Sequence, residues 1–233
     1  SRAILERVGA GELPETLRLA RPGAMVAFAK QDAVSSGYAE AVSAARAGGF
    51  EAVLRLAGGR AAVFHEGTIA LAHALPEGDP RPGIHLRFEG TAALVARALR
   101  RLGVDSHVGE VPGEYCPGGY SVNARGERKL AGLGQRLVAG AAHTGGVIVV
   151  DGAERVRDVL VPVYDALGLD WDPASAGAVN DEVPEAGWDD VRGALLDEYA
   201  QRYELVPAEL DEGTLGLARR YAGEHRSHDP VLG

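Results

Sequence analysis

The single cysteine of this chain, Cys116, constrains its fold most, because one thiol cannot close an internal disulfide. The folded state must therefore be held together by buried apolar surface. The chain has 233 residues, of which 46% are hydrophobic, and this is enough for one large domain with a sizeable core. We expect a fold that needs neither a disulfide nor an oxidising compartment.

Apolar segments of strand length alternate with helical segments through most of the chain. Strands are expected at 25–29, 51–56, 61–65, 68–73, 120–123, 129–132, 135–139 and 147–150, and helices at 38–47, 84–102 and 153–167. We expect Ser36 and Asp151 to cap two of these helices. After Pro184 the pattern is purely helical, and a last helix is expected to begin at Pro207. These patterns predict an α+β (α/β) sheet domain at 1–183 and a short C-terminal helical extension at 184–233.

Charge and composition argue against several classes of function. The formal net charge is −9, whereas broad nucleic-acid binding requires a basic surface. No segment approaches the roughly 18 apolar residues of a membrane-spanning helix, and the first residues lack the apolar core of a signal peptide. The seven histidines have no cysteine or carboxylate at a metal-ligand spacing. We expect a cytoplasmic protein with no nucleic-acid partner, no membrane partner and no structural metal.

Cys116 lies in a segment rich in glycine and proline, and Lys129, one of only two lysines, follows shortly after it. A thiol is a nucleophile only as the thiolate, and a nearby ammonium group favours the thiolate. This pairing indicates acyl transfer through a thioester. A buried, inert cysteine is a common alternative, and a lysine on a strand usually faces solvent. The residues alone leave these interpretations open.

Two pairs of glycines are candidate binding elements. Gly58 and Gly59 separate two expected strands and can direct backbone N–H groups at a bound acyl or phosphate group. Gly132 and Gly134, just after the lysine, would let a ligand approach the strand closely. Neither pair fits a nucleotide-binding fingerprint, because no Gly-Lys-Ser/Thr follows the first and Leu137 stands where the second requires a third glycine.

Taken in order, these segments resemble the lipoate/octanoate protein ligase and transferase family. Residues 55–65 are similar to that family's Arg-Arg-x-x-Gly-Gly-x-Ala-Val-x-His motif, which walls the acyl tunnel. Residues 129–136 are similar to its Lys-hydrophobic-x-Gly-Ser-Ala-Gln-x-Arg motif, whose lysine is essential. Cys116 followed by Tyr120 resembles the cysteine-dependent octanoyltransferase branch, in which a loop cysteine carries the acyl group as a thioester.

The resemblance implies a biotin/lipoate protein ligase-like fold, in which helices flank a central mixed sheet. It implies that Cys116 and Lys129 are the catalytic residues. The substrate-binding residues that it implies are Arg55, Gly58, Gly59, Arg60, Val63, Phe64, His65, Tyr120, Gly132, Gly134 and His143. Three places depart from the family motifs: Leu56 replaces the second arginine, Leu133-Gly134 replaces Ser-Ala, and His143 lies about one position off the family's His-Gly-Ser.

Three functions are compatible with these residues. In the first, the Cys116 thiolate takes an octanoyl or lipoyl group from an acyl carrier protein or the glycine-cleavage H protein, and a lysine of a lipoyl-domain protein accepts it, without a cofactor. In the second, a lipoate–protein ligase uses ATP and Mg²⁺, and Lys129 contacts the acyl-adenylate. In the third, the protein binds an acyl group and transfers none. A cysteine hydrolase that pairs Cys116 with His143 is a further alternative.

Overall fold

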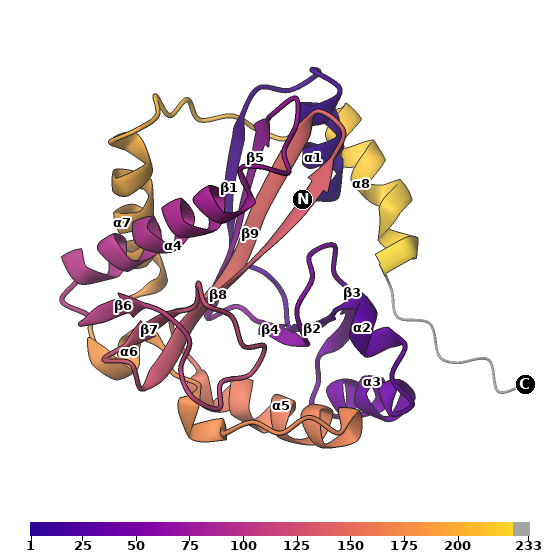
Figure 1. Ribbon diagram of the computed structural model, residues 1–233, viewed down its shortest axis with the longest axis vertical. Helices are drawn as coiled ribbons and strands as arrows, with labels where there is room; N and C mark the ends of the chain where they lie inside the picture. Colours follow the sequence, from indigo (N-terminus) through magenta and orange to yellow (C-terminus); the bar gives the residue numbers. More distant parts are fainter. Residues whose placement is uncertain (226–233) are drawn as a thin grey trace, which may run out of the picture.

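The computed structural model describes residues 1–225, and its central element is a six-stranded antiparallel sheet in the order β1-β5-β9-β8-β7-β6 (Figure 1). The strands are β1 (Thr16–Ala20), β5 (Thr68–Pro76), β6 (Ser106–Val108), β7 (Val122–Ala124), β8 (Arg128–Val138) and β9 (Ala141–Val149). β8 and β9 form a long hairpin, and β5 pairs with β9 along its whole length. These three strands provide the surface that carries the candidate site.

A smaller sheet, in the order β3-β2-β4, lies beside one end of the large sheet (Figure 1). Its strands are β2 (Met25–Phe28), β3 (Glu51–Leu54) and β4 (Ala62–Phe64). β2 pairs in parallel with β3 and antiparallel with β4, so this sheet is mixed. The neighbouring helices are α2 (Lys30–Ala33), α3 (Tyr38–Ala47) and α5 (Ala153–Leu167). α3 and α5 pack together and bury the small sheet in one apolar cluster.

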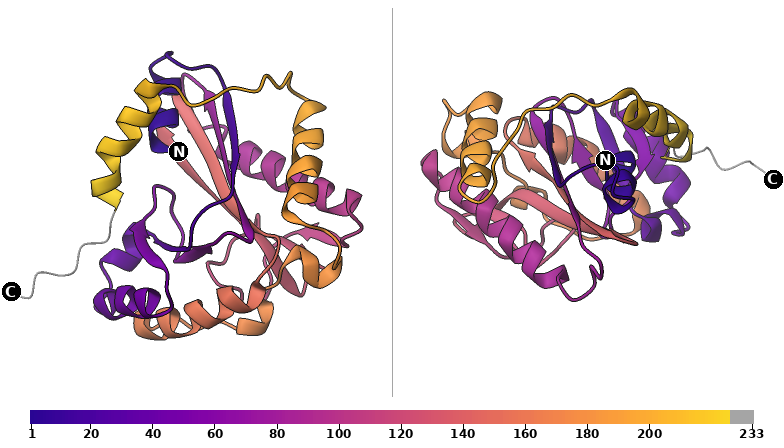
Figure 2. Two further views of the ribbon diagram at one scale, coloured as in Figure 1. Left: turned by 180° about the vertical axis from the view of Figure 1, so that it is seen from behind. Right: turned by 90° about the horizontal axis from the view of Figure 1, so that it is seen from above.

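The remaining helices lie on the large sheet and around its ends (Figure 2). They are α1 (Arg2–Gly9), α4 (Ile84–Arg101), α6 (Val179–Glu182), α7 (Trp188–Ala200) and α8 (Glu212–His225), together with a 3₁₀ turn at Pro173–Ser175. α4 and α7 cover one face of the large sheet, where Leu99 and Leu195 share a core with Ile148 of β9. α8 packs on α1 and buries little; Thr214 is its one buried residue.

The other face of the large sheet is built from small residues. The register places Gly134 of β8 opposite Gly145 of β9, and Gly145 opposite Ala72 of β5. One step along, Gly132, Val147 and Ala70 form the next row on the same face, because side chains two residues apart on a strand share a face. Rows of glycine and alanine leave space above the sheet, and this face supports the cavity described below.

The predicted fold class is confirmed, with one correction to the sheet. The expected single central mixed sheet is two sheets: the large one is antiparallel, and the mixed pairing belongs to the small one. Two expected strands at 129–132 and 135–139 form the single strand β8, because glycines within a strand do not interrupt its pairing. The segments that contain α1 and β1 were not predicted as regular structure.

The predicted boundaries of α3 and α5 agree with the structure, whereas their predicted N-cap residues do not. α3 and α5 begin and end where the pattern predicts, but Gly37 and Gly152 occupy their N-cap positions, with no side-chain cap. The predicted caps are therefore wrong; the Asp151 carboxylate instead accepts a hydrogen bond from Asn180. The last helix begins at Glu212 rather than at Pro207, after an exposed extended segment. Residues 226–233 of the predicted extension lie outside the described residues.

Within residues 1–225, no helix combines the length and apolarity that crossing a bilayer requires.

Candidate active site

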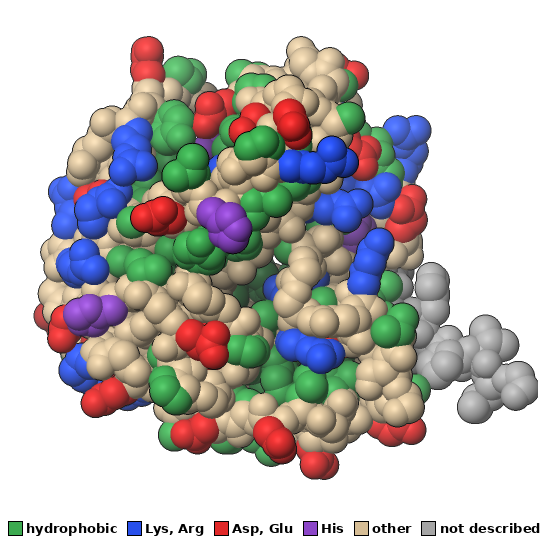
Figure 3. All heavy atoms as spheres, viewed as in Figure 1, with side chains coloured by type: hydrophobic (Ala, Val, Ile, Leu, Met, Phe, Trp, Pro, Cys, Tyr) green, Lys and Arg blue, Asp and Glu red, His purple; other side chains and the backbone are tan. Residues whose placement is uncertain are grey.

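A cavity of about 1020 Å³ lies against the small-residue face of the large sheet. Its walls include Ala70 and Val147 from the sheet, the segment between β3 and β4, the loop that carries Cys116, and Tyr221 of α8 at one end. Figure 3 shows a hollow near the middle of the molecule with hydrophobic side chains around it. The volume is at the upper end of the roughly 300–1,000 Å³ usual for small-molecule sites.

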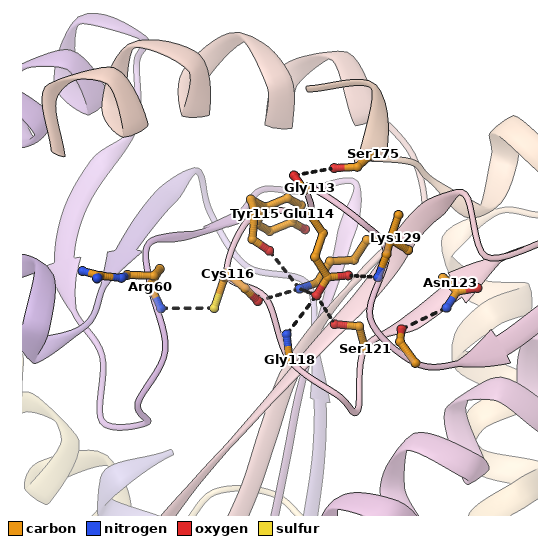
Figure 4. Close-up of polar contacts among 12 residues, drawn as sticks. Arg60, Gly113, Glu114, Tyr115, Cys116, Gly118, Ser121, Asn123, Lys129 and Ser175 are labelled. Atoms are coloured by element: carbon orange, nitrogen blue, oxygen red, sulfur yellow. Dashed lines mark hydrogen bonds and ion pairs between the residues drawn. The ribbon is translucent and has the colours of Figure 1, made fainter. Parts of the chain in front are cut away.

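The thiol of Cys116 contributes to the wall of this cavity and is half-buried. Its sulfur accepts a hydrogen bond from Nη2 of Arg55 at 3.3 Å and another from the backbone N–H of Arg60 at 3.1 Å. Both donors come from the segment between β3 and β4, and Figure 4 shows the backbone N–H of Arg60 directed at the sulfur. A guanidinium and an N–H group directed at a sulfur can donate to it and stabilise negative charge that develops there during a reaction.

The backbone of Cys116 is held in a conformation that few residues other than glycine adopt. Its φ is +45°, in the left-handed region, which costs an L-residue roughly 1–2 kcal/mol. Its N–H donates to the hydroxyl of Tyr164 on α5 at 2.9 Å. Strained backbone of this kind persists only where surrounding contacts impose it, and it is found often at functional sites.

A buried ion pair joins the cysteine loop to β8 (Figure 4). The Nζ atom of Lys129 donates to Oε1 of Glu114 at 2.9 Å, to the carbonyl of Tyr115 at 3.0 Å and to the carbonyl of Cys116 at 2.8 Å. The side chains of Lys129 and Glu114 are 1% and 0% exposed. Both oxygens of Glu114 also accept from the loop, through the N–H groups of Val111 and Gly118 and the hydroxyl of Ser121.

These contacts correct the predicted pairing of Cys116 with Lys129. An ammonium group has three protons to donate, and all three of Lys129 are directed to Glu114 and to two loop carbonyls. Among residues 1–225, Lys129 makes no hydrogen bond to the sulfur, and the cation at the sulfur is Arg55. Lys129 therefore holds the backbone of the cysteine loop, and its charge is balanced by Glu114.

The backbone of Gly59 allows the close approach between the two segments. Its φ is +101°, and a Cβ at this position would lie 2.8 Å from the sulfur of Cys116 and would also overlap the guanidinium of Arg55. Only a residue without a side chain fits both the angle and the space. In the same way, a Cβ on Gly134 would lie 2.8 Å from Cβ of Ala57, so the sheet glycine makes room for the segment above it.

Comparison with protein families gives a match over residues 1–197 to the lipoyl protein ligase A/B catalytic domain. The chain belongs to this family. Both sheets lie within the matched residues and thus belong to a lipoyl protein ligase A/B catalytic domain.

Known proteins similar to this catalytic domain include transferases and ligases. An octanoyl-[GcvH]:protein N-octanoyltransferase of Geobacillus kaustophilus is 31% identical over 71% of this chain and 58% of its own length. The bi-partite lipoate protein ligase of Thermoplasma acidophilum has a similar fold, with a TM-score of 0.70 and 20% identity over 94% of this chain and 85% of the other. A lipoate-protein ligase A bound with ATP gives a TM-score of 0.71 at 19% identity, over 94% and 87%. The chain spans about half the length of the curated relatives it matches.

Most of the predicted substrate-binding residues line the cavity of this catalytic domain. Those on its wall are Arg55, Gly58, Gly59, Phe64, Tyr120, Gly132, Gly134 and His143, together with Cys116 and Lys129. The departures at Leu56 and Leu133 line it as well. Tyr120 stacks on Phe88 of α4, with ring centroids 5.0 Å apart, and so joins the cysteine loop to that helix.

Three of the predicted substrate-binding residues do not line the cavity. Val63 is buried in the core of the small sheet, on the side of β4 away from the cavity. His65 is buried behind β4, where its Nδ1 accepts the N–H of Gly67 at 3.1 Å. Arg60 contributes its backbone N–H to the sulfur, while its guanidinium pairs with the buried Asp32 at 3.3 Å. Alternation along a strand explains the first two, because neighbouring residues on β4 face opposite sides.

His143 lies on the small-residue face, and a Cβ on Gly145 would overlap its ring, so the ring lies over that glycine. Neither ring nitrogen has a hydrogen-bond partner within the described residues. Burial, reinforced by nearby positive charge, lowers its pKa to about 4, so the ring is neutral near pH 7. The part of the chain that the structure describes contains no hydrogen bond between His143 and the sulfur of Cys116, and a Cys–His dyad is not formed.

Two residues of the site were missed from the sequence. Glu114 stands two positions before the cysteine, and a carboxylate in a Gly/Pro-rich loop looks like any solvated turn residue. Tyr164 lies on the apolar face of α5, so the sequence pattern indicates only a residue that packs in the core. A buried lysine needs a counter-charge, so the small and apolar residues that follow Lys129 are the sequence signal that could have pointed to a carboxylate partner.

No cluster of three histidine, cysteine, aspartate or glutamate side chains that could hold a metal ion occurs within residues 1–225.

Proposed function

We propose that this chain transfers an octanoyl group from the glycine-cleavage H protein to a lysine of a lipoyl-domain protein, through a thioester on Cys116. The observation that carries the proposal is the thiol at the cavity wall, with a guanidinium and a backbone N–H directed at its sulfur. The printed names of several relatives, all octanoyl-[GcvH]:protein N-octanoyltransferases, support the donor and the acyl group.

The transfer takes place in two steps. The sulfur of Cys116 attacks the acyl carbonyl carbon, a C–S bond forms, and the bond to the donor's lysine nitrogen breaks as that nitrogen takes up a proton from solvent. The neutral lysine amine of the acceptor then attacks the thioester, an amide bond forms, the C–S bond breaks, the amine's extra proton passes to solvent, and the thiolate of Cys116 leaves. Arg55 stabilises the thiolate before the first step and after the second. Lys129 and Glu114 hold the cysteine loop throughout.

The apolar part of the cavity supports a fatty acyl group as the cargo. The wall includes Phe64, Leu71, Leu133 and Val147 around the glycines of the sheet. Each methylene buried there contributes about 0.8 kcal/mol, so an eight-carbon chain gains several kcal/mol of binding free energy over a short one. Because the sulfur lies in this wall, a bound chain would have its carbonyl end at the nucleophile.

Intact-mass measurement tests the proposal directly. The protein is incubated with octanoylated H protein, and we expect an added octanoyl mass that disappears with hydroxylamine and is absent from Cys116→Ser. Subsequent addition of a lipoyl-domain protein should move that mass to the acceptor. Failure to acquire the mass, or an adduct that persists in Cys116→Ser, would contradict the thioester route.

The alternative function is that of an ATP-dependent ligase, because a lipoate-protein ligase A bound with ATP has a similar fold. A variation of the same experiment tests it. Free octanoic acid with ATP and Mg²⁺ replaces the acylated H protein. We expect no modification of the acceptor under these conditions, because the proposed transfer begins from an already activated or protein-bound acyl group. Modification that needs ATP and survives Cys116→Ser would assign the chain to the ligases.

A further inference from the structure

The nucleophile and its hydrogen-bond donors belong to segments that are far apart in the sequence. Cys116 is in the loop between β6 and β7, whereas Arg55 and Arg60 lie between β3 and β4. The cysteine loop is fastened to β8 through Lys129 and Glu114. The β3–β4 segment is fastened to the small sheet and α2. Neither set of contacts sets the distance between the two segments, which determines whether the donors reach the sulfur.

The hydroxyl of Tyr164 joins them. It accepts the N–H of Cys116 at 2.9 Å and donates to the carbonyl of Ala61 at 2.9 Å. Ala61 directly follows Arg60, whose N–H is one of the two donors to the sulfur. The same oxygen atom therefore fixes the backbone of the nucleophile and the backbone beside its donor.

Tyr164 is well suited to hold this position. It is 2% exposed, projects from the last turn of α5, and packs against Trp171 with ring centroids 5.6 Å apart. Burial raises the pKa of its hydroxyl well above 10, so the hydroxyl keeps its proton and remains a donor to Ala61. A rigid ring on a packed helix with both hydrogen bonds made cannot rotate without leaving two buried backbone groups unpaired.

We propose that Tyr164 is a positioning residue for the Cys116 nucleophile: its hydroxyl clamps the cysteine loop to the β3–β4 segment and thereby holds the sulfur against Arg55 and the N–H of Arg60. The proposal rests on Cys116 being the nucleophile of the proposed function. It predicts that the sulfur keeps both hydrogen-bond donors only while the clamp is intact. Without the hydroxyl, the left-handed backbone of Cys116 loses the contact that satisfies its N–H and can relax away from the donors.

The test replaces Tyr164→Phe, which keeps the ring and removes only the hydroxyl. Tyr199→Phe is the matched control, because the Tyr199 hydroxyl is also buried but has no hydrogen-bond partner within residues 1–225. The rate of alkylation of Cys116 by iodoacetamide is measured against pH. We expect Tyr164→Phe to react about tenfold to a hundredfold more slowly near pH 7, with its pH curve moved to higher pH. Tyr199→Phe should match the unmodified protein.

Alkylation requires no acyl donor, so this result is independent of whether Cys116 carries an octanoyl group. An unchanged pH curve in a folded Tyr164→Phe protein would overturn the proposal even if octanoyl transfer is observed. Should that variant not fold, amide hydrogen exchange of the unmodified protein decides the question. The N–H of Cys116 is expected to exchange as slowly as those of β8; rapid exchange would show that the clamp does not hold.

Discussion

At the scale of single residues, a guanidinium nitrogen and one backbone N–H face the sulfur of Cys116. Arg55→Leu removes the charge and one donor. We expect the alkylation rate of Cys116 near neutral pH and the rate of its acylation to fall about tenfold or more, because the sulfur loses the cation that stabilises its negative charge. Arg55→Lys should recover part of both rates, since it restores the charge without the planar fork. Equal rates in Arg55→Leu and the unmodified protein would show that the arginine does not act on the thiol.

The ion pair beneath the cysteine loop makes a different prediction, on stability. Lys129→Met leaves the buried carboxylate of Glu114 without its counter-charge, and we expect the free energy of unfolding to fall by roughly 3–5 kcal/mol. Adding Glu114→Gln to Lys129→Met removes the unpaired charge and should restore part of that loss. Urea denaturation of the single and double variants measures both effects. If the double variant were less stable than Lys129→Met by the whole loss that Glu114→Gln causes alone, the two side chains would not be directly paired.

The lowered pKa of His143 predicts how the free energy of unfolding depends on pH. Its pKa in the folded protein is about 4, against an ordinary value of 6.5, chiefly because of burial. Below pH 6.5 the unfolded chain binds a proton that the folded protein does not bind until about pH 4. The free energy of unfolding therefore falls as the pH drops through this window, by at most roughly 3 kcal/mol. His143→Leu should flatten that slope in urea denaturation. Burial also lowers the pKa of His65 and His73, so part of the slope should remain.

At the scale of elements, the β3–β4 segment depends on Gly59. Gly59→Ala would place a methyl group against the sulfur of Cys116 and force a φ of +101° on a residue with a side chain. We expect thiol alkylation and acylation to fall about a hundredfold. Gly193→Ala, in open space on α7, is the control and should raise stability by about 0.5–1 kcal/mol without affecting the thiol. A fully reactive thiol in Gly59→Ala would show that the segment moves freely.

Elements were predictable where a local pattern sets them. The segments of α3, α4 and α5 follow from apolar spacing and terminal glycines, and β2 and β4 from short apolar runs. α1 and β1 were missed for different reasons. α1 has a clear buried face, but its eight residues are short for a helical pattern to be recognised, and β1 is half-buried throughout, so its residues do not alternate. The sequence also could not predict which side of β4 Val63 and His65 face, because a short apolar strand shows no alternation of apolar and polar residues.

At the scale of the whole molecule, α7 and α8 differ in how they are held. Val191 and Leu195 of α7 belong to the core of the large sheet, whereas α8 is attached to α1 by polar contacts, among them the ion pair of Arg2 with Glu224. We expect a chain ending at Gln201 to unfold cooperatively and a chain ending at Pro184 not to fold. Thermal unfolding followed by circular dichroism distinguishes them. A stable chain ending at Pro184 would instead support the predicted boundary between 183 and 184.

The amino-acid sequence by itself determined the fold class, the family, the lone thiol and most of the residues that line the cavity. These follow from composition, from periodicity within a segment and from short motifs. Only the tertiary structure decided which cation faces the sulfur. The ammonium of Lys129 turns to Glu114 and the loop carbonyls, while Arg55 arrives from a segment that precedes the cysteine by about sixty positions. Such contacts depend on how separate segments pack and on where a buried charge finds its partner, and no local pattern encodes that choice.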